Sequence, residues 1–264
     1  MKKTLLYFLG FMFCGLTSIA QNDSIQPIIP DRPTQSVSPY LVPKGSFQIE
    51  SGAMFTNRED QSDVMEMWSI GNTLLRYGVY ENFEVRLSSS FESNNTLVKN
   101  SEIDSSYNGM GPVSAGFKVF IVEEKGIRPE IAIIASITFR HIGSEYFRPT
   151  FSYPAGLIVM NHNITNRLSL GYNVGFAYSG ENADGFFTYS GFLGYSISKR
   201  FWSFAEVYGN FDHGNYPNHK ADAGLTYLLR NNLQLDVSGG FGLTGTDEVS
   251  RYFISAGLSW RIPR

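Results

Sequence analysis

Apolar and polar residues alternate along most of this chain. The clearest segment places Phe83, Val85 and Leu87 at one set of alternate positions and Glu84 and Arg86 at the other. Successive side chains of a β-strand point to opposite sides. A period of two therefore predicts a strand with one apolar face and one polar face.

The same alternation recurs about twelve times after residue 45, in segments of roughly 10 to 13 residues, close to the length that a tilted membrane-crossing strand needs. The predicted strands are 46–57, 66–78, 82–92, 111–122, 129–140, 151–162, 167–178, 186–197, 200–211, 220–229, 232–244 and 250–262. Longer connections follow the odd-numbered strands, at 58–65, 93–110, 141–150, 179–185, 212–219 and 245–249. The other connections are tight. This pattern predicts an all-β fold, a transmembrane antiparallel up-and-down β-barrel of about 12 strands with both termini in the periplasm.

In most predicted strands the alternation also assigns the two faces. Leu233, Leu235 and Val237 would contact lipid, whereas Gln234 and Asp236 would point into the barrel. A soluble sandwich or lipocalin-like fold is the alternative. It is disfavoured because its many apolar faces would lack a covering layer.

One predicted strand, 66–78, has no consistent apolar face. Trp68, Ile70 and Leu74 occupy the same alternate positions as Arg76. The pattern alone leaves the orientation of this strand open.

After residue 20 the longest apolar runs are 131–137 and 154–160. A membrane-spanning helix needs about 20 apolar residues, so these runs are too short. A chain that crosses lipid with strands must close into a barrel, because an open sheet edge would leave backbone donors and acceptors unpaired.

The first twenty residues have the pattern of a secretory signal peptide. Lys2 and Lys3 precede an apolar stretch at 5–19, and Ser18-Ile19-Ala20 supplies small residues for cleavage before Gln21. The only cysteine, Cys14, lies within this leader. Phe11-Met12-Phe13 before it lacks the small residues of a lipid-attachment site, which disfavours a lipoprotein.

The charge balance excludes one class of partner. Removing Lys2 and Lys3 leaves 19 of the 21 basic residues against 24 acidic ones, a formal charge of −5. Nucleic-acid-binding proteins carry a basic surface, so no nucleic acid is expected.

The segment before the first predicted strand is rich in proline, with Pro27, Pro30, Pro33, Pro39 and Pro43. Proline at this density keeps a chain extended and outside a sheet interior. We therefore expect three regions, a signal peptide at 1–20, a proline-rich periplasmic N-terminal extension at 21–45, and an outer-membrane barrel at 46–264.

Two stretches around the start of the barrel, 31–40 (DRPTQSVSPY) and 42–52 (VPKGSFQIESG), resemble the opening of a family of bacterial outer-membrane barrels. The family occurs notably among Bacteroidetes and is classed with transporters or under the label MetA-pathway of phenol degradation. The resemblance implies passage of small hydrophobic or aromatic molecules. The chain departs from the family pattern at Thr34 and Val37, where an acidic or polar run is expected.

The inward positions of the predicted barrel carry both signs of charge. The candidate pore-lining residues are Glu50, Glu84, Arg86, Glu92, Lys118, Arg140, Glu206, Asp236 and Arg261, with Glu130 and Asp222 on the same face. These charges either pair with one another and fill the lumen or line a narrow channel. Trp202, Phe204 and Tyr208 around Glu206 favour a path for an amphipathic ligand, although Phe201 and Val207 compete for the outward face.

The proline-rich segment provides a candidate plug. Asp31 and Arg32 lie about fourteen residues before the first predicted strand, within reach of the periplasmic mouth at roughly 3.3 to 3.6 Å per extended residue. We expect Arg32 to meet an inward carboxylate such as Glu50 or Glu84, and the segment to gate passage.

Enzymatic and metal-binding functions find little support. His162 has no serine fixed beside it by spacing, and Asp212-His213 with His219 lacks the spacing that fixes two metal ligands. We expect no catalytic residues, no metal and no cofactor.

The sequence thus predicts a barrel in the outer membrane of a Gram-negative bacterium that conducts small hydrophobic or aromatic solutes. Its expected partners are outer-membrane lipid, the solute and the barrel-assembly machinery. The alternative is a non-transporting structural or surface barrel, or an outer-membrane lipid-acting enzyme.

Overall fold

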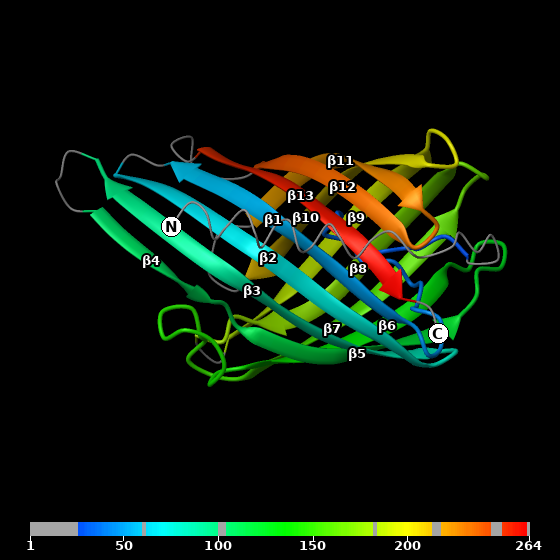
Figure 1. Ribbon diagram of the computed structural model, residues 1–264, viewed down its shortest axis with the longest axis horizontal. Coiled ribbons are helices and arrows are strands. Elements are labelled where there is room, and N and C mark those ends of the chain that lie inside the picture. The colour runs from blue at the N-terminus through cyan, green and yellow to red at the C-terminus, as the bar shows by residue number, and fades with distance from the viewer. Residues whose placement is uncertain are drawn as a thin grey trace, which may run out of the picture.

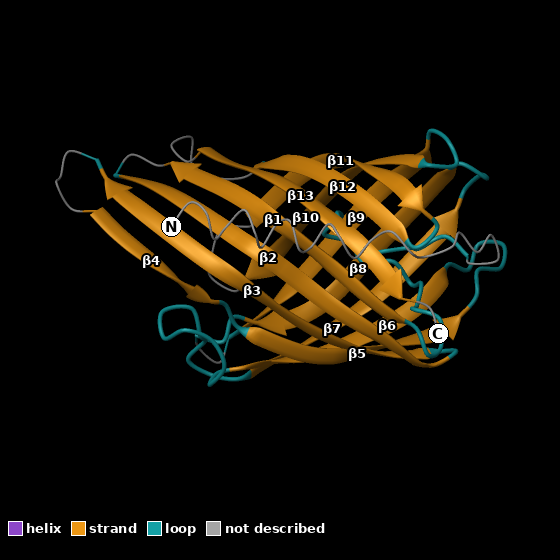
Figure 2. Ribbon diagram, viewed as in Figure 1, coloured by secondary structure: helices purple, strands orange, loops and turns teal. Residues whose placement is uncertain are grey.

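The computed structural model describes residues 26–59, 62–99, 104–181, 184–212, 218–243 and 250–262, so the expected signal peptide lies outside the described residues. The described chain is built from strands (Figures 1 and 2). They are β1 (Phe47–Glu59), β2 (Asp63–Tyr80), β3 (Phe83–Val98), β4 (Asp104–Met110), β5 (Val113–Val122), β6 (Glu130–Phe139), β7 (Tyr153–Asn163), β8 (Leu168–Tyr178), β9 (Gly185–Ser196), β10 (Phe201–Asp212), β11 (Asn218–Arg230), β12 (Leu233–Gly242) and β13 (Ser250–Ile262). Nowhere in these ranges is there a helix long and apolar enough to span a bilayer.

The strands form one closed antiparallel barrel. Each strand from β5 to β13 pairs with its sequence neighbours, and β1 pairs with both β13 and β2, which closes the sheet. The first half of β3 pairs with β5, as in Glu84↔Lys118, and its second half pairs with β4, as in Asn94↔Tyr107. β4 and β5 follow each other along the same side of β3 and together act as one strand of the barrel wall. Counted in this way, the barrel has twelve strands in the described chain, as predicted.

The two ends of the barrel differ. At one end, here called the turn end, the described connections are 81–82, 123–129, 164–167, 197–200 and 231–232. β1 begins and β13 ends at this same end of the barrel. The opposite end, here called the loop end, carries the connection 140–152. A hairpin of β3 and β4 projects beyond the rest of the barrel at the loop end (Figure 1).

Two predicted loops at the loop end are largely strand instead. β1 continues to Glu59 and β2 begins at Asp63, so only a short connection remains where 58–65 was expected. The expected loop 93–110 forms the end of β3 and all of β4, apart from 100–103, which lie outside the described residues. The prediction was wrong because backbone pairing does not require apolar alternation. Ser- and Asn-rich segments form a ladder when their neighbours hold them in register.

The barrel is apolar outside and polar inside. Leu235 on β12 is 42% exposed, whereas the adjacent Asp236 is 3% exposed. Aromatic pairs cover the outer surface near both ends, with Phe83–Phe117 and Phe201–Tyr227 toward the turn end and Phe55–Trp68 and Phe176–Phe187 toward the loop end. This arrangement is that of a transmembrane barrel with two aromatic girdles.

A β-bulge in β2 resolves the ambiguous strand. The pairing of β2 with β3 shifts register between Ile70 and Thr73, and Gly71 in the gap has a φ of 59°. Glycine adopts this left-handed conformation without strain, and the extra residue reverses the alternation. Trp68, at 41% exposed, therefore faces outward, while Arg76, at 0% exposed, faces the lumen.

The outward face gives a first testable expectation. Leu235→Arg places a charge in lipid near mid-strand and should cost about 2 to 4 kcal/mol of folding free energy. The matched control is Thr188→Arg, because Thr188 lines a cavity of about 310 Å³ inside the barrel. Urea titrations in lipid vesicles measure the folding free energy of both variants. Equal destabilisation would contradict the assigned faces.

Candidate functional site

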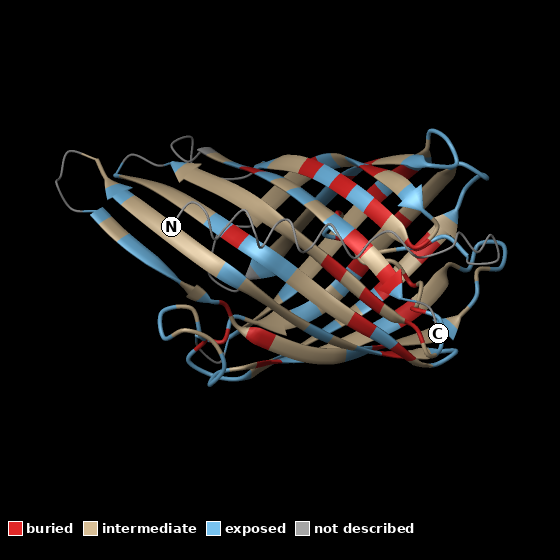
Figure 3. Ribbon diagram, viewed as in Figure 1, coloured by how far each residue is buried: buried red, intermediate tan, exposed pale blue. Residues whose placement is uncertain are grey.

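Residues 26–46, here called the plug segment, enter the barrel at the turn end. Near the entrance the amide of Ile28 donates to the carbonyl of Asn231 at 2.7 Å. Deeper in the lumen, Val37 exchanges two hydrogen bonds with the side chain of Asn173, at 2.7 and 3.0 Å. The segment then returns, and Gly45 donates to the carbonyl of Gly78 before β1 begins. Burial is concentrated toward this end of the barrel (Figure 3).

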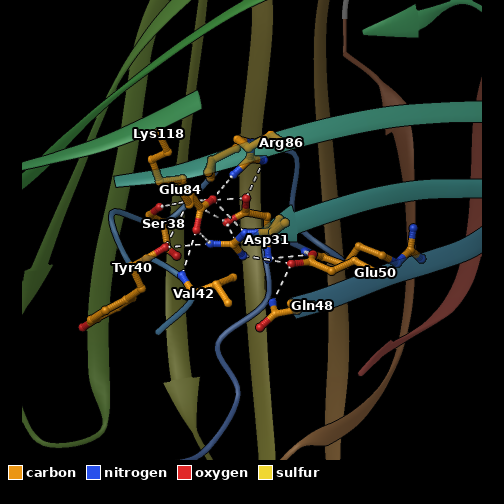
Figure 4. A network of polar contacts seen from close by, with 12 residues as sticks. Asp31, Ser38, Tyr40, Val42, Gln48, Glu50, Glu84, Arg86 and Lys118 are labelled. Carbon is orange, nitrogen blue, oxygen red and sulfur yellow. Dashed lines mark hydrogen bonds and ion pairs between the residues drawn. The ribbon is translucent and has the colours of Figure 1, made fainter. Parts of the chain in front are cut away.

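Asp31 of the plug segment lies among three cations from the barrel wall. Its carboxylate lies 2.7 Å from Arg86, 3.1 Å from Lys118 and 3.5 Å from Arg76. Burial alone would raise the pKa of Asp31, but the attraction of Arg76, Lys118 and Arg86 outweighs it and holds the pKa well below its usual range. Asp31 is therefore ionised when docked, and Figure 4 shows the cluster around it.

Arg76 connects the plug segment to two wall carboxylates. Its guanidinium forms ion pairs with Glu50 and Glu84, both at 2.9 Å, and donates to the carbonyl of Tyr40 at 2.8 Å. Lys118 donates to the carbonyls of Ser38 and Tyr40, at 2.9 and 3.1 Å. Together the cluster contains three carboxylates and three cations, which are Asp31, Glu50, Glu84, Arg76, Arg86 and Lys118. Each of the three carboxylates has a cation within ion-pair distance, which offsets part of the cost of burying its charge.

The same carboxylates also bind the backbone of the plug segment. One oxygen of Glu50 accepts from the amides of Asp31 and Arg32, at 2.9 and 3.0 Å. Glu84 accepts from the amide of Val42 at 2.8 Å. An extended chain has no internal partners for its amides, so these carboxylates replace the water that would otherwise bind them.

Arg32 extends toward the opposite wall. Its guanidinium pairs with Asp236 at 2.9 Å and donates to Ser255 Oγ at 3.1 Å. It lies over Gly52 and Gly257, which face each other on β1 and β13, and a Cβ at either position would overlap it. Arg32 thus meets inward carboxylates, as expected, but its guanidinium binds Asp236 and only its amide binds Glu50.

A second pair of wall carboxylates lies on β10 and β11. Glu206 accepts from the amides of Gln35 and Ser36 of the plug segment, at 2.7 and 2.6 Å. Asp222 is directly opposite Glu206 in the strand register, and in the described part of the chain its buried carboxylate oxygens meet no donor, because the facing Glu206 is itself a carboxylate. Two neighbouring carboxylates in one site oppose each other's ionisation.

This pair leads to a stabilising substitution. Asp222→Asn should raise the free energy of unfolding by about 1 kcal/mol, because an amide donates to Glu206 at any pH, whereas a carboxyl group donates only while it holds a proton. Urea unfolding in lipid vesicles at neutral pH provides the measurement. The matched control is Asp236→Asn, which should destabilise, since Asp236 is paired with Arg32. A loss of stability in Asp222→Asn would show that the carboxyl group of Asp222 stabilises the barrel, and would contradict this prediction.

The remaining candidate pore residues lie apart from the central cluster. Glu92 accepts from Ser69 and Ser90 farther toward the loop end, and Arg140 lies just beyond β6 in the connection 140–152. Arg261, at the turn end, donates to the carbonyl of Gln26. The sequence thus identified wall residues that meet the plug segment, but it missed Arg76. The bulge at Gly71 reverses the alternation of β2, so the local pattern did not show that Arg76 points into the lumen. It also missed Gln48 and Asn173, which are neutral.

The histidines considered for catalysis or metal binding lie elsewhere. His162 contacts the hydroxyl of Tyr172 at 3.3 Å, and His219 contacts that of Tyr189 at 2.7 Å. His213 lies outside the described residues. Among the residues that the structure describes, no group of three or more His, Cys, Asp or Glu could hold a metal ion.

The plug segment divides the space in the lumen. A cavity of about 340 Å³, here called the turn-end cavity, is lined by plug residues and by the walls of β7 to β12. Cavities of about 310 and 260 Å³ are lined by Val37 and Gln35, the innermost part of the plug segment. The inward face of β10 carries Trp202, Phe204, Glu206 and Tyr208. The structure thus decides which side of this strand faces the lumen, a point that the sequence left open.

The family model described as "Putative MetA-pathway of phenol degradation" matches residues 30–262, and the chain belongs to this family. No curated protein matches the sequence. Among solved structures, the chain resembles the COG4313 outer membrane channel from Pseudomonas putida F1, with a TM-score of 0.60 and 7% identity over 84% of this chain and 97% of that one. It also resembles the translocator domain of autotransporter NalP from Neisseria meningitidis, with a TM-score of 0.53 and 10% identity over 84% and 90% of the two chains. These likenesses show a shared barrel fold.

Proposed function

We propose that this member of the family is a passive conduit for small hydrophobic or aromatic molecules across the outer membrane of a Gram-negative bacterium. One observation carries the proposal. The lumen is occupied by a segment that joins the barrel covalently only at β1 and is otherwise held by hydrogen bonds and ion pairs. Such a segment can leave the lumen without unfolding a strand.

The solute class is supported by the wall and by the family. Trp202 and Phe204 face the lumen on β10, and Phe192 faces it on β9. Aromatic rings provide apolar contact area for a small aromatic molecule. The family description refers to phenol degradation, and the similar structure from Pseudomonas putida F1 is an outer membrane channel. Barrel-assembly machinery and outer-membrane lipid are the proposed partners, since a barrel of this type must be inserted into a bilayer.

Uptake by intact cells tests the proposal. Cells that produce the protein should take up radiolabelled toluene several-fold faster than cells without it. Equal uptake with and without the folded protein would reject the conduit.

The charge cluster favours a second candidate, a non-transporting barrel. Three carboxylates and three cations meet at the plug segment, and a balanced buried network of this kind also suits a permanently filled lumen. The two candidates differ in conductance. A permanently filled barrel should remain closed in planar bilayers after the plug contacts are weakened, whereas a conduit should open.

The proposed orientation places the turn end in the periplasm. A cysteine introduced at Asp104, in the β3–β4 hairpin, should react with a membrane-impermeant maleimide on intact cells. A cysteine at Glu81, in the β2–β3 turn, should react only after the cells are broken. The native Cys14 is replaced by serine in both variants. The reverse labelling pattern would invert the orientation.

A further inference from the structure

The turn-end cavity has an aromatic wall. Phe192 and Trp202 line it from the barrel, and Ile28 and Pro30 line it from the plug segment. The two rings lie 5.8 Å apart at an interplanar angle of 78°, and Trp202 also stacks on Phe204 at 5.5 Å. A volume of about 340 Å³ suits a ligand with a single aromatic ring.

Two glycines allow these rings to lie against the barrel wall. A Cβ at Gly171 would overlap the ring of Phe192, and a Cβ at Gly194 would overlap that of Trp202. Both rings therefore lie directly on the neighbouring strand, which leaves space between them and the plug segment. Tyr40 of the plug segment lines the same cavity.

The charged residues that line this cavity are all cations. They are Arg32, Arg167, Lys199 and Arg200, and no Asp or Glu of the described residues is in the lining. The carboxylate of Asp236 neutralises Arg32, but within the described ranges Arg167, Lys199 and Arg200 form no ion pair. This sign is opposite to that of the whole chain, which carries a formal charge of −3.

These three cations, Arg167, Lys199 and Arg200, belong to two adjoining turns. Arg167 ends the turn 164–167, and its carbonyl accepts from Ser196 at the end of β9 at 2.8 Å. Lys199 and Arg200 lie in the turn 197–200, and the Arg200 carbonyl accepts from Leu228 at 2.8 Å. They therefore flank the mouth of the cavity, while the aromatic rings lie on the strands behind them.

We propose that the turn-end cavity binds aromatic carboxylates. The ring of the ligand packs between Phe192, Trp202 and the plug segment, and its carboxylate is held by Arg167, Lys199 and Arg200. This inference deepens the proposed function by naming a solute class, and it rests on that function only for the route by which the solute arrives. A neutral aromatic molecule would gain the ring contacts but not the charge-assisted hydrogen bonds, which are the stronger ones.

Trp202 provides a direct readout of binding. The chain has three tryptophans, and the other two, Trp68 and Trp260, lie on the outward face. In Trp68→Phe/Trp260→Phe protein, purified in detergent, fluorescence reports on Trp202 alone. The probes are 4-nitrobenzoate and the neutral 4-nitrobenzamide, both nitroaromatic quenchers of similar size.

We expect saturable quenching by 4-nitrobenzoate with about tenfold or higher affinity than by 4-nitrobenzamide, the effect of one charge-assisted hydrogen bond. The variant Lys199→Gln/Arg200→Gln should lose this preference. The matched control is Lys125→Gln/Arg128→Gln, in the turn 123–129 at the same end, where neither residue lines the cavity. This control should retain the preference.

Equal affinity for the two probes, or full 4-nitrobenzoate affinity in Lys199→Gln/Arg200→Gln, would overturn the inference. A second outcome would also overturn it. If quenching never saturates, and phosphatidylglycerol binds to the wild type but not to Lys199→Gln/Arg200→Gln, then these cations contact lipid headgroups instead of the ligand. Binding in detergent requires no transport. Its failure is therefore distinguishable from a failure of the proposed conduit, which the toluene uptake experiment tests separately.

Discussion

Deletion of residues 22–42 is expected to raise the single-channel conductance of the reconstituted barrel several-fold. The deletion removes Asp31 and Arg32, together with the amides that Glu50, Glu84 and Glu206 bind. Water then enters the lumen and solvates the wall charges. The barrel itself should remain folded, because its strands pair with one another and not with the deleted segment.

A milder variant keeps the plug segment but weakens its ionic contacts with the barrel wall. Asp31→Asn/Arg32→Gln keeps the chain length but removes the ion pairs with Arg86, Lys118 and Asp236. It should show frequent openings at a conductance between those of the wild type and the deletion. Heat-modifiable migration in gels verifies that each barrel is folded. Unchanged conductance in both variants would show that the segment does not gate the lumen.

The second large effect concerns stability. Arg76→Met should lower the free energy of unfolding by about 3 to 5 kcal/mol, because removing one partner of a buried ion pair leaves the other charge uncompensated. Arg76 is the cation that contacts Glu50 and Glu84 at once, and its loss leaves both carboxylates and Asp31 with fewer counter-charges. Urea titration in lipid vesicles measures this change.

The matched control is Arg140→Met, since Arg140 is exposed at the loop end, beyond the end of β6, whereas Lys118 of the cluster pairs with Ile134 farther down that strand. It should be nearly neutral. The triple variant Arg76→Met/Glu50→Gln/Glu84→Gln should recover part of the lost stability, because it removes the uncompensated charges. If Arg76→Met were as stable as the wild type, water would already solvate the cluster, and the plug segment would not be held by buried charge.

These expectations share one physical basis. The plug segment has five prolines, which lack an amide donor, so fewer of its backbone groups need partners. The amides of Asp31, Arg32, Gln35, Ser36 and Val42 all bind carboxylates of the wall. These are single side-chain contacts, in contrast to the continuous ladders of backbone hydrogen bonds that fix each barrel strand on both sides. Displacing a segment held in this way should cost less free energy than displacing any strand of the barrel.

The sequence by itself determined the barrel and the direction of most of its side chains. Lipid outside and water or polar chain inside impose a period of two, so Leu235 and Asp236 could be assigned from alternation alone. The same reasoning placed Glu50, Glu84, Arg86 and Lys118 on the inner wall. The role of the proline-rich segment as a gate remains a proposal that the conductance measurement decides.

Only the tertiary structure decided which of these groups meet. The bulge at Gly71 turns Arg76 into the lumen, and nothing in the local pattern indicates where a register shift falls. Likewise, Arg32 pairs with Asp236, which is 204 residues away, because closure of β1 against β13 brings β12 beside the plug segment. Periodicity is a local property that solvent imposes on each strand, whereas ion pairing across a lumen depends on the register and closure of the whole sheet.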